Sequence, residues 1–118
     1  MTRRTDRINE LLREELSDLI RQEVKDPRVS GIVSITEVQS SQDLHYSRVY
    51  VSIMGTDAEK DDTIKALTTA AGFLRRELAS RLKLRSIPEL NFMRDDSIEK
   101  GARLLELIKK ANSNTSGS

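Results

Sequence analysis

"HYSRVYVSIM", residues 45–54, alternates apolar and polar side chains and is the clearest strand signal in the chain. Successive side chains of a strand point to opposite faces, so Val49, Val51 and Ile53 would lie together on one buried face. The β-branched residues at these positions also favour an extended backbone. The other face would carry polar and aromatic side chains and stay open to solvent: Tyr46, Arg48, Tyr50 and Ser52.

A second strand is predicted just before it, in GIVSITEVQSS, residues 31–41. Val33 and Ile35 alternate with polar residues, but Val38 reaches the same face only if a β-bulge follows Ile35. The segment SSQDL, residues 40–44, has the composition of a turn. So short a connection favours an antiparallel hairpin.

Helices are predicted on both sides of the hairpin. Apolar residues recur at steps of three and four over residues 5–24, which indicates an amphipathic helix, and Pro27 would end it. A second helical pattern covers residues 64–84. The acidic segment before it, GTDAEKDD at residues 55–62, is expected to be a linker whose last carboxylates favour the helix N-terminus.

The C-terminal part of the chain completes the predicted fold. SIPELNFM, residues 86–93, predicts a short third strand, and Asp96 with Glu99 forms a variant of the capping box that would open a last helix. We expect one domain over residues 1–112, in which helices cover one face of a three-stranded sheet. A disordered polar tail is expected at residues 113–118.

The composition argues against several classes of function. The chain has no cysteine and a single histidine, His45, so it offers neither a thiolate nucleophile nor a cysteine-based metal site. Its acidic pairs, at residues 61–62 and 95–96, precede helices, where carboxylates are favourable without a metal. No apolar run approaches the ~18 residues of a membrane-spanning helix. We therefore expect a soluble, cytoplasmic protein that has no catalytic site, metal, cofactor or small-molecule substrate.

Positive charge is concentrated in two segments, although the net charge is only +1. Residues 73–88 hold five cations against Glu77 alone, and residues 1–7 hold three against Asp6. Several of these cations stand at the start of a helical segment, where they oppose the helix dipole and would be explained by an incoming anion. An ordinary solvated surface is the alternative. The candidate residues for binding a polyanion such as RNA are Arg3, Arg4, Arg7, Arg75, Arg76, Arg81, Lys83 and Arg85.

Gly72 stands in the middle of the second helical pattern, where a glycine costs about 1 kcal/mol relative to alanine. One interpretation is a single long helix that tolerates the glycine, because the apolar spacing of Leu67, Ala71 and Leu74 does not slip there. The other is a kink at Ala70, Ala71 and Gly72. After such a kink, a second helical segment would begin with free backbone N–H groups that attract phosphate. The residues alone leave both interpretations open.

Four segments, taken in order, resemble the ribosome-binding factor A family. They are KDPRV at 25–29, the predicted hairpin at 33–53, the interruption at 70–72, and LRSIPELNFMRDDSIEKGARL at 84–104. The resemblance extends from Arg7 to about Leu107. It implies a type II KH-like α+β fold, helix-strand-strand-helix-kink-helix-strand, followed by a C-terminal helix. Members of the family lack the GxxG loop of RNA-clamping KH domains and carry an Ala-x-Gly kink; in this chain no two glycines are spaced three apart.

The resemblance implies a role in ribosome biogenesis. Members of the family bind the free small (30S) ribosomal subunit late in its maturation, act near the ends of 16S rRNA, assist maturation of its 5′ end and are important for growth in the cold. They are assembly factors rather than enzymes, so the basic residues named above would bind RNA and residues 70–72 would form the interhelical kink. We expect a monomer that binds no membrane. A small protein–protein interaction module without direct RNA binding is the alternative that the residues themselves leave open.

Overall fold

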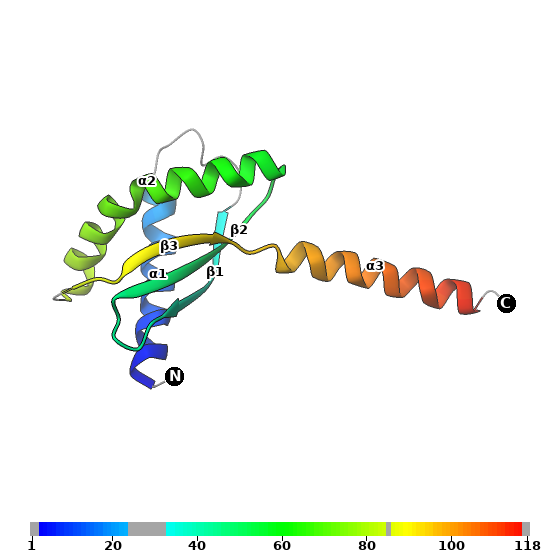
Figure 1. Ribbon diagram of the computed structural model, residues 1–118, viewed down its shortest axis with the longest axis horizontal. Coiled ribbons are helices and arrows are strands. Elements are labelled where there is room, and N and C mark those ends of the chain that lie inside the picture. Colours follow the sequence, from blue (N-terminus) through cyan, green and yellow to red (C-terminus); the bar gives the residue numbers. More distant parts are fainter. Residues whose placement is uncertain (1–2, 24–32, 85, 117–118) are drawn as a thin grey trace.

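The computed structural model describes residues 3–23, 33–84 and 86–116, and it has an α+β fold of three helices and one three-stranded sheet (Figure 1). The predicted end of the first helix at Pro27 and the candidate residue Arg85 lie outside the described residues. The predicted order of helices and strands is confirmed, whereas the type II KH-like classification stays a prediction. The elements are α1 (Arg3–Glu23), β1 (Val33–Ser40), β2 (Tyr46–Ile53), α2 (Asp57–Leu82), β3 (Glu89–Arg94) and α3 (Ser97–Ser116).

β2 is the central strand of the sheet, whose order is β1-β2-β3. β1 pairs with β2 in antiparallel orientation, which confirms the predicted hairpin. The register between them shifts from Ile35 to Glu37, which confirms the predicted β-bulge. β3 pairs with β2 in parallel orientation. Since two parallel strands cannot be joined by a tight turn, α2 forms the connection between them.

A single apolar core joins the inner face of the sheet to α1 and α2. It is built almost wholly from aliphatic side chains, and burial of one such side chain is worth roughly 1.5–3 kcal/mol. The outer face of β2 is open, with Tyr46 and Arg48 exposed to solvent, as the alternation predicted. The core apolar residues with no exposed surface are Leu12, Leu16, Leu19, Val49, Leu67, Leu74 and Leu78.

α2 begins earlier than the apolar pattern indicated. Thr56 is its N-cap: the Thr56 hydroxyl accepts a hydrogen bond from the backbone N–H of Glu59 at 3.2 Å, and the Glu59 carboxylate accepts one from the backbone N–H of Thr56 at 3.1 Å. This capping box satisfies two N–H groups that a helix start otherwise leaves unpaired. The prediction of a linker over residues 55–62 is therefore wrong from Asp57 onward, because its carboxylates form the first turns of the helix.

α2 is one continuous helix that passes through Gly72 without a break. The predicted division into two helical segments is not present, and the N–H groups that follow Gly72 lie within the helix. Leu67, Leu74 and Leu78 stay buried on one side, so packing against a single sheet keeps both halves in phase. The ribbon of α2 nevertheless curves along its length (Figure 1). The helix ends at Lys83, whose φ of 52° forms a left-handed cap.

α3 projects away from the rest of the molecule (Figure 1). The whole molecule therefore extends 65 Å along its longest axis. Every residue from 97 to 112 is exposed, including Leu105 at 61% and Ile108 at 46%. The expectation that the helices all cover one face of the sheet is wrong for α3. This helix also continues to Ser116, so residues 113–116 are helical where a disordered tail was predicted. Extending an existing helix adds one backbone hydrogen bond per residue, which composition alone does not reveal.

Replacing Gly72 with alanine is expected to stabilise the protein by about 0.5–1 kcal/mol, because alanine restricts the unfolded chain and favours a helix. A Cβ at this position would meet only ordinary contact, since the nearest atom, Nη1 of Arg76, lies 3.8 Å away. Urea unfolding followed by circular dichroism measures the change. Gly101→Ala in α3 is the matched control, which should raise helicity without shifting the unfolding of the core. A less stable Gly72→Ala protein would contradict this reading and show that the curve of α2 needs glycine.

Candidate nucleic-acid interface

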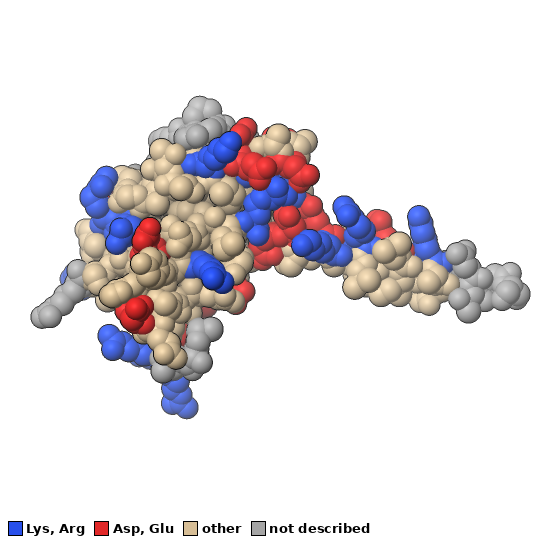
Figure 2. Space-filling model, viewed as in Figure 1, with Lys and Arg blue, Asp and Glu red and all other residues tan. Residues whose placement is uncertain are grey.

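Charged side chains are unevenly distributed over the face shown in Figure 2. In this view, Lys and Arg side chains project around the start of α1 and the C-terminal half of α2, and also from α3. Asp and Glu side chains concentrate where α2 begins and α3 departs. A polyanion would be attracted to the first region and repelled by the second.

Arg4 of α1 and Lys83 at the end of α2 line one groove of about 420 Å³, although they are far apart in sequence. Leu44 of the hairpin turn lines the same groove. Its backbone φ of 60° is rare for a leucine. Its N–H donates a hydrogen bond to the carbonyl of Ser41 at 2.9 Å, which closes the turn. We call this surface the basic groove, and its lining residues are Arg4, Ile8, Asp43, Leu44, Lys83, Leu84, Ser86 and Pro88.

Two of the predicted binding residues are engaged in holding the fold together. Arg81 lies 3.4 Å from Glu15 and 3.5 Å from Asp18, so it joins α2 to α1 and is neutralised there. The guanidinium of Arg75 donates a hydrogen bond to the carbonyl of Ile87 at 3.0 Å, which fixes the chain that leads into β3. Both arginines therefore have a structural reason for their positions.

The remaining candidate cations within the described residues are exposed, and none of them has an ion pair with another described residue. Arg3 and Arg7 flank Arg4 on the first turns of α1, and Arg76 stands on α2 beside Gly72. Of the predicted kink residues, Ala70 and Ala71 are half-buried and Gly72 is exposed. The structure thus brings Arg4 and Lys83 into one groove, with Arg3 and Arg7 close in sequence to Arg4.

An acidic network lies where α3 leaves the body of the molecule. Arg94, at the end of β3, lies 2.8 Å from Asp57, 3.0 Å from Asp61 and 3.1 Å from Asp96. Its hydrogen bond holds the pKa of the Asp57 carboxyl below the usual range, and these carboxylates raise the pKa of Arg94. The network ties the start of α2 to the end of β3 and to the residue before α3. One member of each acidic pair, Asp61 and Asp96, therefore neutralises an arginine, a role that the sequence did not indicate.

Two further residues, Lys60 and Asp95, make contacts that fix the first turn of α3. The side chain of Lys60 is only 3% exposed and pairs with Glu99 and, at 3.7 Å, with Asp96. Asp95 accepts hydrogen bonds from the Thr36 hydroxyl at 2.5 Å and from the backbone N–H of Ser97 at 2.9 Å. Bonds from Ser97 and Thr36 lower the pKa of Asp95. The direction of α3 is therefore set by charged contacts at its base.

Among the described residues, no group of three or more His, Asp or Glu side chains is arranged to hold a metal ion. Within the described ranges, none of the helices combines the length and the apolar character needed to cross a membrane. His45 is exposed at the hairpin turn, where its Nδ1 lies 3.3 Å from the carboxylate of Asp43.

Comparisons with known proteins agree on one family. The family model described as ribosome-binding factor A matches residues 4–108. Ribosome-binding factor A of Acetivibrio thermocellus is 47% identical over 115 residues, which cover 98% of this chain and 94% of the relative. The solution structure of a Thermotoga maritima protein superimposes with a TM-score of 0.72 at 34% identity, over 82% of this chain and 92% of that one.

A further structural neighbour comes from Thermus thermophilus. It is a homology model of ribosome-binding factor A fitted into the cryo-EM map of a 30S complex with that factor. Its TM-score is 0.63 at 27% identity, and the match covers 75% of this chain and 91% of the neighbour. Both superpositions support the α+β fold over the part of the chain that they cover.

Replacing Arg94 with glutamine is expected to lower the urea midpoint at neutral pH, because the aspartates around it lose their cation. In the wild type, the hydrogen bond from Arg94 holds the folded pKa of Asp57 below the ordinary value of 3.8. The stabilisation from this pair is therefore complete above about pH 4 and is lost as the pH falls through the lowered pKa of Asp57. The difference between wild type and Arg94→Gln should accordingly shrink below pH 4.

Arg21→Gln is the matched control for this measurement, because it removes an exposed ion pair to Asp18 at 3.0 Å, and such pairs contribute little. A destabilisation by Arg94→Gln that stayed constant between pH 7 and pH 3 would show that packing of the side chain matters instead of its charge.

Proposed function

The chain belongs to the ribosome-binding factor A family, and we propose that it binds the free 30S subunit through 16S rRNA and assists late processing of that RNA without catalysing a reaction. The relative fitted into a 30S complex supports the choice of partner. In this proposal the protein acts in the cytoplasm as a monomer, and its effect comes from binding alone.

The observation that carries the proposal is the meeting of Arg4 and Lys83 in the basic groove. Both are exposed and have no ion pair with a described residue, so their charge is available to a phosphate. Ile8, Leu44 and Pro88 form the apolar part of the groove lining beside these two cations. Phosphate contacts of this kind supply affinity and fix orientation without reading sequence.

The charge distribution supports a defined orientation on the RNA. The acidic side chains around Arg94 lie at the other end of the domain, where they would be repelled by phosphate. The start of α1 and the end of α2 would therefore face the rRNA. Recognition of folded RNA by shape and backbone fits a surface that offers cations and few base-reading groups.

The paired replacement Arg4→Glu with Lys83→Glu is expected to weaken co-sedimentation with purified 30S subunits by roughly tenfold or more at about 0.1 M salt. The slope of log affinity against log salt should fall by about one for each phosphate contact that is lost. Circular dichroism should be unchanged, since both side chains are exposed.

Lys65→Glu with Lys109→Glu makes the same change in net charge on exposed cations outside the groove and serves as the control. An equal loss in both pairs would argue against the groove as the contact. Wild-type binding that does not depend on salt would favour docking onto a ribosomal protein instead.

A further inference from the structure

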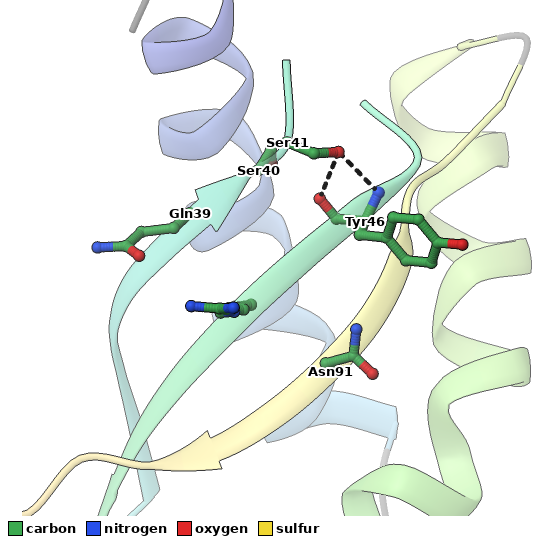
Figure 3. A pocket seen from close by; sticks show the side chains of 6 residues that line it. Gln39, Ser40, Ser41, Tyr46 and Asn91 are labelled. Atoms are coloured by element: carbon green, nitrogen blue, oxygen red, sulfur yellow. Dashed lines mark hydrogen bonds between the residues drawn. The ribbon is translucent and has the colours of Figure 1, made fainter. Parts of the chain in front are cut away.

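The open face of the sheet carries a second, separate hollow. It has a volume of about 460 Å³, and we call it the open-face pocket; its lining residues are Gln39, Ser40, Ser41, Tyr46, Arg48 and Asn91. Gln39 comes from β1, Tyr46 from β2 and Asn91 from β3 (Figure 3). Strand register places Gln39, Arg48 and Asn91 side by side across the three strands. Two amides therefore flank one guanidinium in a single row.

Tyr46 offers an exposed aromatic ring at the edge of this row. Its side chain is 56% exposed, which is unusual for a large aromatic group. The Ser41 hydroxyl accepts a hydrogen bond from the backbone N–H of Tyr46 at 3.2 Å and lies 3.3 Å from its carbonyl oxygen (Figure 3). The ring of His45 meets the Tyr46 ring edge-on, with centroids 6.5 Å apart. The backbone that carries the ring is thus held in place before any ligand arrives.

Arg48 supplies a cation without a carboxylate partner among the described residues. The acidic residues of this face stand one row to either side, with Glu37 opposite Tyr50 and Glu89 opposite Tyr46. Glu37 accepts a hydrogen bond from the side-chain amide of Gln39 at 3.0 Å. The row that contains Arg48 therefore holds positive charge and amide groups only.

We infer that the open-face pocket binds one unpaired nucleotide of RNA. The base stacks on Tyr46, the amide of Asn91 meets its hydrogen-bonding edge, and Arg48 neutralises the adjoining phosphate. The inference rests on RNA being the ligand, as in the proposed function, but it concerns a different surface and a different mode of contact. The basic groove would bind backbone, whereas this pocket would bind a base.

The two surfaces adjoin each other at the hairpin turn. Leu44 of the turn lines the basic groove, and Ser41 at its start lines the open-face pocket. An RNA strand that leaves the groove can therefore pass around the turn and place an unpaired base on the sheet. This continuity favours RNA over a protein partner as the occupant.

The test measures binding of fluorescently labelled single-stranded oligoadenylate RNA and of an RNA duplex to the intact chain. Tyr46→Ala should weaken binding of the single strand at least ~5-fold, the lower limit for loss of one base–aromatic stack. Tyr46→Phe should bind normally, because it keeps the ring. Met93→Ala is the control, since Met93 is exposed on β3 outside the pocket. Duplex binding should be unaffected by all three changes.

A Tyr46→Ala protein that binds the single strand as well as the wild type does would overturn the inference. The inference would also be overturned if Tyr46→Ala lost contact with a ribosomal protein while its binding to RNA was unchanged. If Tyr46→Ala does not fold, NMR of the wild type decides, because oligoadenylate should shift the amide signals of Tyr46, Arg48 and Asn91. Unshifted signals would reject the pocket. The double variant Arg4→Glu with Lys83→Glu is assayed in the same experiment. Its binding shows separately whether the basic groove contacts RNA.

Discussion

The regular alternation of β2 is the constraint on which the rest of the structure depends. Its apolar face receives both α1 and α2, and its two edges pair with β1 and β3. A slip of one residue would turn Val49 and Val51 to solvent and bury Tyr50, so the register is strongly specified. Because this register fixes both helices relative to the hairpin turn, it also brings Arg4 and Lys83 to one groove.

The carboxylates around each arginine determine whether its charge is already neutralised within the fold. Arg81 and Arg94 lie within ion-pair distance of acids on other elements and hold those elements together. Arg4 and Arg48 have no such partner among the described residues, and they lie beside hollows that a ligand can enter. Composition and net charge do not separate these two groups, since both contribute the same formal charge.

The sequence was sufficient wherever a local pattern decides the structure. Alternation predicted the hairpin, and the position of Val38 predicted the bulge. Prediction failed where tertiary contacts decide: packing keeps α2 whole through Gly72, and nothing in its apolar pattern shows that α3 stands apart from the sheet. The capping box at Thr56 has the sequence pattern T-x-x-E, but the acidic residues around it led to the prediction of a linker. Pairing of Arg81 with Glu15 joins distant segments, so spacing could not reveal it.

The parallel pairing of β2 with β3 has a consequence for the order in which the chain folds. β1 and β2 meet through a short turn, whereas β3 must wait until the whole of α2 has been synthesised. Closing so long a loop costs entropy before its contacts repay it, so this edge forms late. Asn91 reaches Arg48 only when that step is complete. In a nascent or partly folded chain, Tyr46 is therefore exposed before Asn91 has taken its place beside Arg48.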